Sequence, residues 1–176
     1  MKVIKTSLDG CVIIEPDVFC DERGFFLETY QKERYKNEAG INVDFVQDNF
    51  SRSYKNVLRG LHFQKNKPQG KLVRVVRGKV LDVAVDIRQD SNTFGDWVSV
   101  ELSSENKKQL WVPPGFAHGF LVISDTADFA YKCTDFYDSS DEGTIIWNDP
   151  LININWPISD PSLSDKDAVA QSLSEI

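Results

Sequence analysis

The sequence is poor in cysteine, histidine and positive charge. It contains three cysteines and two histidines among 176 residues, and 20 lysines and arginines stand against 27 aspartates and glutamates. The resulting net charge of −7 repels nucleic acid and anionic membranes over long range. We therefore expect no nucleic-acid or membrane partner, and an anionic ligand must be held by a local cluster of cations.

Disulfides, a secretion signal and membrane spans are not indicated either. Cys11, Cys20 and Cys133 are an odd number without a CxxC spacing, which predicts three free thiols in a reducing compartment. Charged residues interrupt the first 17 positions, and no apolar run is long enough to cross a bilayer. The expected location is the cytoplasm.

What is present fits one folded unit. A chain of 176 residues is about the size of one domain and can bury roughly 70% of the surface that its unfolded form exposes. The composition is 41% hydrophobic, with 10 glycines and 7 prolines, which is typical of a globular protein rather than a disordered or fibrous one. We expect a single domain over residues 1–176.

Most of the chain has the period of β-strands. Residues 71–87, KLVRVVRGKVLDVAVDI, alternate and predict two strands joined by a tight turn at Arg77 and Gly78. Further strands are expected in WVSVELS, QLWV, HGFLVIS, DFAYKCTDFY and GTIIWND. Many short strands indicate a closed antiparallel sandwich or barrel, since closure removes exposed edges. The prediction is an all-β jelly-roll barrel with a few short helices.

Two segments favour helices instead. Residues 29–40 are good helix formers that end at Gly40, a suitable left-handed cap. Residues 162–176 form the second segment, with Ser164 as the N-cap and acidic residues in the first turn. In this helix Val169, Leu173 and Ile176 are expected to share one face.

The two histidines argue against a metal site. Pro113, Gly115 and His118 form a PxGxxH pattern that resembles the second motif of the cupin superfamily. Metal-binding cupins carry HxH and then Glu in the first motif, whereas here His62 is followed by Gln64. Since an amide oxygen is a poor substitute for imidazole on a transition metal, we expect a cupin-like barrel that binds no metal.

His62 lies on an apolar strand together with basic residues. Arg59 precedes it and Lys71 follows, and burying unpaired cations is costly, so an anionic ligand or a carboxylate is implied. Strict alternation puts Arg59 and His62 on opposite faces. Both can line one pocket only if Gly60 carries a bulge or kink, and a regular strand at Gly60 would remove Arg59 from the site.

Three further positions carry suitable chemistry, each with a plain structural alternative. Arg23, with Phe26 and Glu28, offers a planar fork for phosphate and a ring that can stack, but could be a surface charge beside core aromatics. Tyr131 could donate a proton or simply be a hydrogen-bonded core tyrosine. Asp167 could orient an imidazole or be an ordinary carboxylate in a first helical turn.

Ordered motifs along most of the chain resemble the dTDP-4-dehydrorhamnose 3,5-epimerase family. They are RGFFLE, FVQDNFS, VLRGLHFQ, PQGKLVRVVRGKVLDVAVDIR, TFGDW, LWVPPGFAHGFLV, YKCTDFY, WNDPLININWP and LSDKD. The resemblance implies a cupin-type jelly roll and a homodimer in which an N-terminal strand reaches into the partner. It also implies a dTDP-sugar substrate on the route to dTDP-L-rhamnose and no cofactor. Phe50 and Tyr54 depart from the residues expected at their positions, which bears on fine substrate preference.

Residue roles follow from the same resemblance. It implies His62 as general base, Asp167 as its orienting partner, Lys71 as the stabiliser of the enolate oxygen, and Tyr131 as general acid on the opposite face of the sugar ring. The residues implied for substrate binding are Arg23, Phe26, Glu28, Gln47, Asn49, Arg59, His118, Tyr137 and Lys166, with Arg23 and its neighbours acting across the dimer interface.

Other functions remain open at this point. A mono-epimerase acting at C3 or C5 alone would keep the same base and acid. A non-catalytic nucleotide-sugar binding module would keep Arg23 and Arg59 but would not need His62, Lys71, Tyr131 and Asp167 together. A metal-dependent cupin oxygenase would bind metal tightly and lose activity with chelators.

Overall fold

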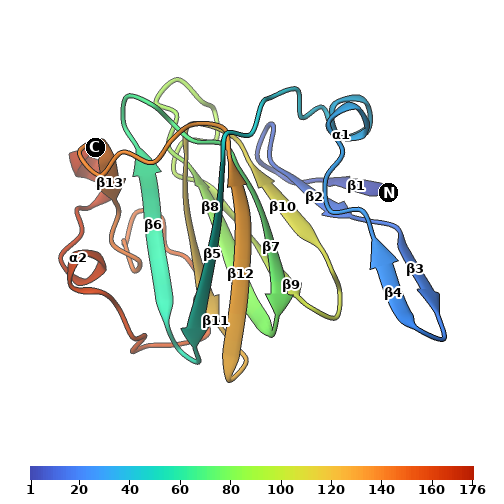
Figure 1. Ribbon diagram of the computed structural model, residues 1–176. Coiled ribbons are helices and arrows are strands. Elements are labelled where there is room, and N and C mark those ends of the chain that lie inside the picture. The colour runs from blue at the N-terminus through green and yellow to red at the C-terminus, as the bar shows by residue number, and fades with distance from the viewer.

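Two antiparallel sheets lie face to face, and a separate hairpin stands beside them (Figure 1). The computed structural model describes residues 1–176. The first sheet has the order β1-β2-β10-β7-β12-β5, with the bounds β1 Lys2–Lys5, β2 Val12–Glu15, β10 Gln109–Val112, β7 Lys71–Arg77, β12 Thr126–Cys133 and β5 Gln47–Tyr54. The second has the order β13-β6-β11-β8-β9, with the bounds β13 Glu142–Thr144, β6 Leu58–Gln64, β11 Phe116–Val122, β8 Lys79–Asp86 and β9 Trp97–Ser103.

The predicted jelly roll is confirmed, but its closure is not. The chain is mostly strand, and the two sheets remain separate ladders. The two strands predicted around Gly78 are β7 and β8, and they lie in opposite sheets rather than pairing with each other. Gly78 has φ +78°, and a Cβ there would lie 2.0 Å from the Thr126 carbonyl oxygen. The turn therefore needs glycine, and it carries the chain from one sheet to the other.

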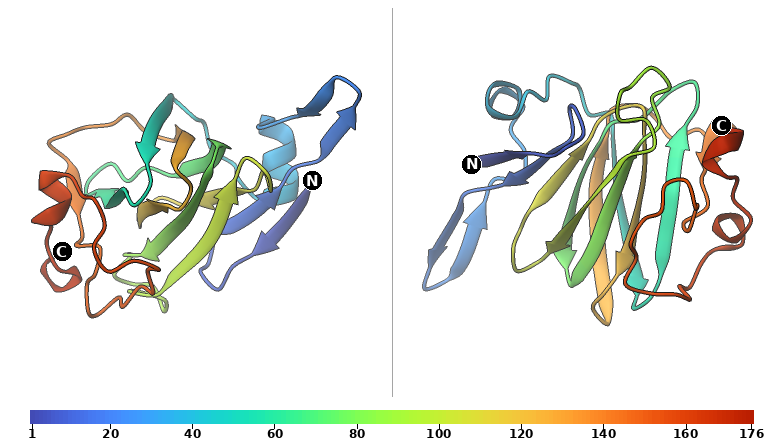
Figure 2. Two further views of the ribbon diagram at one scale, coloured as in Figure 1. Left: turned by 90° about the horizontal axis from the view of Figure 1, so that it is seen from below. Right: turned by 180° about the vertical axis from the view of Figure 1, so that it is seen from behind.

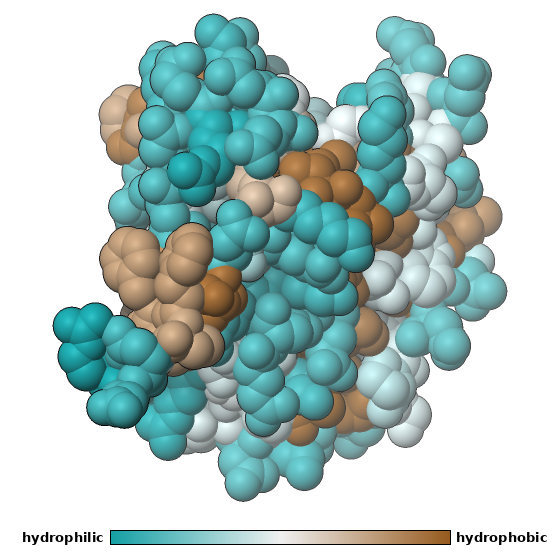
Figure 3. Space-filling model, turned by 90° about the vertical axis from the view of Figure 1, so that its right-hand side faces the viewer, coloured by the Kyte–Doolittle hydropathy of each residue, from teal (hydrophilic) through white to brown (hydrophobic).

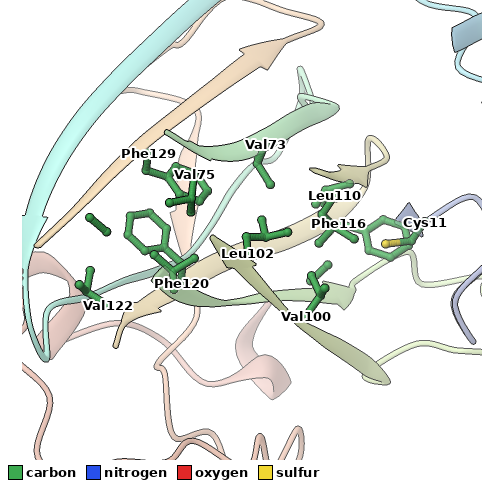
Figure 4. Close-up of a cluster of buried hydrophobic side chains, with 14 of the residues drawn as sticks. Cys11, Val73, Val75, Val100, Leu102, Leu110, Phe116, Phe120, Val122 and Phe129 are labelled. Atoms are coloured by element: carbon green, nitrogen blue, oxygen red, sulfur yellow. The ribbon is translucent and has the colours of Figure 1, made fainter. Parts of the chain in front are cut away.

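Alternating apolar side chains fill the space between the sheets. Fifteen buried residues form the largest cluster, and Figure 4 shows Val73, Val75 and Phe129 packed against Leu102 and Phe120. Fully burying one such side chain stabilises the fold by about 1.5 to 3 kcal/mol. This cluster fixes the distance between the two sheets, and polar side chains pointing inward beyond it are held on rigid walls.

The first predicted helix is confirmed and the second is wrong beyond its first turn. Helix α1, Lys32–Ala39, ends at Gly40 with φ +72°. Helix α2 is only Asp165–Ala168, capped by Ser164, and Val169 after it is 81% exposed. A 3-10 turn, η1 (Leu173–Glu175), then buries Leu173.

The helix stops because its continuation is used for other contacts. The Gln171 backbone bridges to Ile145, and the Ser172 side chain caps the following turn, with Glu175 bonding back to the Ser172 N–H. Val169 therefore does not share a buried face with Leu173. A bridge to a residue 26 positions away in the chain is invisible to helical periodicity.

The hairpin of β3, Val18–Asp21, and β4, Gly24–Leu27, projects away from the sandwich in every view (Figures 1 and 2). Its strands pair only with each other. The three cysteines are free, with Cys20 on this hairpin exposed and the other two buried. None of the helices has the length and apolar character needed to cross a membrane.

Candidate active site

A cavity of about 310 Å³ opens between the two sheets. Its walls come from β5, β7 and β12 of one sheet and from β6, β11 and β13 of the other, with further residues from α2 and the loops. The lining residues are Gln47, Asn49, Ser51, Arg59, His62, Gln69, Lys71, His118, Phe120, Phe129, Tyr131, Tyr137, Glu142 and Lys166. Nine of the thirteen residues expected from the sequence are in this set.

The predicted irregularity at Gly60 is present. Across the β6–β11 ladder, His62 pairs with His118 and Arg59 pairs with Phe120, so that three residue steps on β6 oppose two on β11. Gly60 has φ +125°, and a Cβ on it would lie 2.6 Å from the Gly119 Cα. This bulge turns Arg59 to the same side as His62, and both side chains line the cavity.

Asp167 lies directly behind His62. His62 Nε2 donates to Asp167 Oδ1 at 2.6 Å, and Asp167 is buried in the first turn of α2 with 2% of its surface exposed. Burial acts to raise the pKa of Asp167, but the hydrogen bonds with His62 and Ser164 outweigh it, and the pKa lies below its ordinary value. The carboxylate therefore stays ionised, and His62 keeps its Nδ1 for the cavity.

Lys71 and Tyr131 face His62 from the opposite sheet. Burial lowers the pKa of Lys71, against the nearby charges of Cys133, Glu142 and Asp82. Burial likewise raises the pKa of Tyr131, with Cys133 adding to the effect and a hydrogen bond with Asn49 opposing it. The cavity thus has an imidazole on one wall, and a protonated phenol and the Lys71 amino group on the other.

Three polar side chains gather at the exposed rim. Lys166 Nζ donates to both carboxylate oxygens of Glu142 at 2.8 Å, and Tyr137 Oη donates to Glu142 Oε2 at 3.2 Å. The Tyr137 N–H donates to Gln47 Oε1 at 2.9 Å. Tyr137 lies in the loop after β12, since the strand ends at Cys133 rather than continuing to residue 137. Phe120 and Phe129 also line the cavity, and their rings are stacked with centroids 4.2 Å apart.

Several lining residues were not predicted. Phe120 and Phe129 each lie two positions from a predicted residue, and the strand period places such neighbours on the same face. Gln69 lies in the loop before β7, two positions from Lys71. Ser51 follows Asn49 in the same way. Glu142 belongs to a three-residue strand in a polar stretch and carries no comparable signal.

The cavity does not include the hairpin residues. Arg23 is at the tip of the hairpin with 89% of its side chain exposed and bonds only to Asp21. Phe26 is 68% exposed. Glu28 lies just past the hairpin, 3.0 Å from Arg34 Nη1. Within one chain these three do not meet the residues that line the cavity.

The residues around the histidines are not arranged as a metal-ligand set. Gln64, in the place of a second cupin histidine, donates to the carbonyl oxygens of Lys67 and Phe136 and accepts from the Asp138 N–H. No group of three or more His, Cys, Asp or Glu side chains could hold a metal ion. The absence of a bound metal stays a prediction.

Fold and cavity together define a cupin-type protein with a polar cavity between its two sheets. The chain belongs to the dTDP-4-dehydrorhamnose 3,5-epimerase family, whose model matches residues 5–175. It is 57% identical over 177 residues to the dTDP-4-dehydrorhamnose 3,5-epimerase of Salmonella typhimurium, covering 99% of this chain and 97% of the relative.

Solved structures agree with this membership. A crystal structure of dTDP-6-deoxy-D-glucose-3,5-epimerase from Legionella pneumophila in complex with dTDP-4-keto-L-rhamnose superposes with a TM-score of 0.97 at 56% identity, covering 99% of this chain and 94% of that one. A 3'-monoepimerase from Streptomyces bikiniensis in complex with dTDP-quinovose has a TM-score of 0.89 at 33% identity, covering 96% and 86%. The fold is thus shared by double and single epimerases.

Proposed function

We propose that the protein is a dTDP-4-dehydrorhamnose 3,5-epimerase that converts dTDP-4-dehydro-6-deoxy-D-glucose into dTDP-4-dehydro-L-rhamnose, on the route to dTDP-L-rhamnose. The observation that carries this proposal is the arrangement of His62 and Tyr131 on opposite walls of one cavity. Inversion beside a ketone requires removal of a proton from one face of the ring and delivery of a proton to the other. A base and an acid on facing sheets supply both.

In the proposed mechanism His62 removes the proton from the carbon next to the ketone. Asp167 fixes the ring orientation and stabilises the imidazolium that forms, and a positioned base of this kind contributes roughly a hundredfold to ten thousandfold in rate. The electrons of the broken C–H bond move onto the ketone oxygen, which becomes an enolate. Tyr131 then protonates the same carbon from the opposite face. His62 gives its proton to solvent and the Tyr131 phenolate regains one from solvent, and the sequence then repeats at the second carbon.

Lys71 stabilises the enolate in this scheme. It is partly buried, forms no ion pair within the chain, and lines the same cavity as His62. A preorganised donor at a developing oxyanion contributes about 3 to 4 kcal/mol. The lowered pKa of Lys71, caused by burial, means that its charge is poorly compensated until an anion arrives. The scheme needs no redox cofactor and no metal.

The remaining predicted residues are proposed to bind the nucleotide and diphosphate. Gln47, Asn49, Arg59, His118, Tyr137 and Lys166 line the cavity. Arg23, Phe26 and Glu28 are proposed to act on the cavity of a second copy, with the hairpin as the exchanged arm of a homodimer. Its exposed aromatic residues, Phe19, Phe25 and Phe26, support this, because contiguous exposed apolar surface marks an interaction site.

Figure 3 views the side of the molecule that carries the hairpin and shows apolar surface between polar regions there. The proposed protomer is a single domain. A cytosolic location is part of the proposal, because a substrate with a charged diphosphate does not cross a membrane unaided.

The test is to incubate the protein with dTDP-4-dehydro-6-deoxyglucose in D2O and to follow deuterium at C3 and C5 by NMR. Exchange at both carbons, with a product that an NADPH-dependent reductase accepts, is the expected result. Exchange at one carbon would select the mono-epimerase, which the shared fold of the Streptomyces bikiniensis protein keeps as the second candidate. If neither carbon exchanges although dTDP still binds, the protein is a binding module. If chelators abolish the activity, the enzyme depends on a metal.

A further inference from the structure

The hairpin joins the rest of the chain through residues 28–30, the hairpin foot, which has a buried polar junction of its own. The carbonyl oxygen of Thr29, two residues after β4, accepts from Gln109 Nε2 at 2.8 Å. Tyr35 Oη of α1 donates to Gln109 Oε1 at 2.8 Å and lies 3.0 Å from the same carbonyl oxygen. Because a carbonyl oxygen can only accept, the amide of Gln109 has its nitrogen toward the foot and its oxygen toward Tyr35.

This junction lies inside the protein. Tyr35 and Gln109 are each 1% exposed. Burial raises the pKa of Tyr35 to about 12, against the hydrogen bond with Gln109, so the hydroxyl stays protonated at neutral pH. Gln109 lies on β10, between β2 and β7, and therefore ties the foot to the first sheet as well as to α1. Since buried polar groups need partners, moving the foot away would leave Gln109 Nε2 without an acceptor.

Arg34 holds a second residue of the foot. Its Nη1 lies 3.0 Å from Oε1 of Glu28, and its Nε lies 4.0 Å from Glu38 on the same helix. Oε1 of Glu28 is sealed from solvent and has no hydrogen-bond partner, so the charge of Arg34 is what compensates it. The other oxygen, Oε2, is not sealed and has no partner within the chain. Arg34 therefore decides which carboxylate oxygen of Glu28 faces outward.

The hairpin touches its own chain at one further point. Lys107, in the loop between β9 and β10, places Nζ 4.0 Å from the ring centroid of Phe25. The same ammonium group donates to the Ser104 carbonyl oxygen at 2.7 Å. Figure 1 shows the end of β4 and helix α1 on the same side of the sandwich. These contacts give the hairpin a defined direction before it meets any second copy.

We propose that Arg34 and Tyr35 are positioning residues of the substrate site. They fix the hairpin foot so that Glu28 Oε2 and the rest of the hairpin reach the cavity of a second copy in one preset orientation. This rests on the proposed epimerase function and on the proposed exchange of the hairpin. Holding a binding group in its bound orientation strengthens binding, because less freedom is lost when the ligand arrives. The chemistry at His62 does not depend on it.

The kinetic test is Arg34→Gln, with Lys36→Gln as the matched control. Both remove one positive charge from α1, but Lys36 is exposed and forms no ion pair. An interaction that serves binding alone raises KM, so we expect Arg34→Gln to raise KM by about fivefold to thirtyfold with kcat within about twofold. Lys36→Gln should keep both constants. Both variants are assayed at a concentration where gel filtration gives them the oligomeric state of the wild type. Equal KM values in the two variants, or a loss confined to kcat, would overturn the proposal.

Two further variants separate action through Glu28 from a general effect on the helix. Arg34→Lys keeps the charge, and because the contact with Glu28 is a single ion pair, it should recover most of the lost affinity. If Arg34 acts through Glu28, Arg34→Gln should cost little more in the background of Glu28→Gln, whereas independent effects would multiply. Multiplicative losses in the double variant, or no recovery by Arg34→Lys, would overturn the role of Arg34.

The second measurement needs neither substrate nor turnover. Amide hydrogen exchange of residues 18–27 is compared by mass spectrometry in the wild type, Tyr35→Phe and Tyr30→Phe. Tyr35→Phe removes the hydroxyl from the junction, whereas Tyr30 packs against the same ring and its hydroxyl has no hydrogen bond within the chain. We expect the hairpin amides of Tyr35→Phe to exchange at least about tenfold faster, with those of β7 and β8 unchanged. Tyr30→Phe should match the wild type.

Unchanged hairpin exchange in Tyr35→Phe would overturn the proposal, as would an equal acceleration throughout the sandwich. If Tyr35→Phe does not fold, Arg34→Gln replaces it in the same measurement with the same two outcomes, because 44% of the Arg34 side chain is exposed and its loss leaves the core intact. Failure of the D2O exchange experiment would instead sink the epimerase function and leave the result on the hairpin standing.

Discussion

The cavity and the β3–β4 hairpin carry the same kinds of side chain in opposite surroundings. In the cavity Arg59 Nε donates to Ser53 Oγ at 2.9 Å, and Phe129 is 1% exposed. On the hairpin Arg23 is almost fully exposed, and Phe26 is 68% exposed. Both arginines are exposed, but Arg59 is anchored to Ser53 and lines the cavity with buried rings, whereas Arg23 lies among exposed rings on the hairpin.

This comparison separates side chains that are held in place by contacts within one chain from side chains that have few such contacts. Inward-facing residues of the sandwich are fixed by strand pairing within the chain. The hairpin has only its own two strands, and an isolated two-stranded hairpin is marginally stable at best in water. In the proposed dimer its exposed aromatic residues meet a second copy, and the predictions that follow test whether catalysis depends on the cavity and substrate binding on the hairpin.

The largest effect is expected for His62→Ala. Removing the base should lower kcat by roughly a hundredfold to ten thousandfold, while dTDP binding, measured by calorimetry, stays close to that of the wild type. Phe26→Ala on the hairpin is the comparison variant and should weaken dTDP binding with a smaller loss in kcat. Normal turnover by His62→Ala would remove the general base from the scheme, whatever the hairpin variant does.

Lys71→Met should lower the activity and also raise the thermal stability of the protein. Loss of the oxyanion partner should cost about 3 to 4 kcal/mol of transition-state stabilisation, or roughly two to three decades in kcat. Because the folded-state pKa of Lys71 lies below its ordinary value of 10.5, the folded protein bears the full cost of burying this charge at pH values below that lowered pKa.

The stability difference between Lys71→Met and the wild type should depend on pH. As pH rises from the lowered pKa toward 10.5, Lys71 loses its proton more readily in the folded state, and the cost disappears. Thermal melting should therefore show Lys71→Met above the wild type at neutral pH, with the gap narrowing in alkali. A variant less stable than the wild type at neutral pH would mean that the ammonium group is well compensated in the fold.

The sandwich was largely predictable from the sequence because strand alternation is local. The inward residues of β7 and β12, the left-handed cap at Gly40 and the bulge at Gly60 all follow from a few neighbouring residues. The length of α2 could not be predicted, since it depends on the bridge from Gln171 to Ile145. The assignment of β7 and β8 to different sheets is likewise a property of long-range pairing.

The residues of the cavity were likewise only partly predictable from the sequence. Asp82 is one aspartate in an apolar alternating run, and only the register that brings His118 beside it reveals a partner. Glu142 becomes recognisable once Lys166 and Tyr137 meet it across the rim. Where the hairpin acts cannot be read from local pattern, because its residues do not meet the cavity of their own chain.

A subunit-mixing experiment tests the hairpin directly. If Arg23 serves the partner's cavity, co-expression of His62→Ala with Arg23→Ala produces mixed dimers in which one cavity is intact. About half of randomly formed dimers are mixed, so at a substrate concentration well below the KM of Arg23→Ala the mixture should reach about a quarter of wild-type activity, above either variant alone. A mixture no more active than the average of the two pure variants would mean that each hairpin serves its own chain, and a monomer by gel filtration would rule out the exchange.

The smallest effect is expected for Arg59→Ala, which alters binding inside the cavity without touching the chemistry. Ser53 engages Nε of Arg59, and the terminal nitrogens remain available for an anionic ligand. Losing a charge-assisted hydrogen bond to the diphosphate should raise KM by about tenfold to a hundredfold, with kcat within about twofold.

Arg52→Ala is the control, because Arg52 lies on the outer face of the same β5 strand that carries Ser53 and pairs there with Asp128. An unchanged KM would show that the Gly60 bulge turns Arg59 toward the cavity without giving it a ligand. A loss confined to kcat would mean that Arg59 contacts the sugar rather than the nucleotide. Catalysis would then depend on the cavity, and most of the binding energy would come from the hairpin.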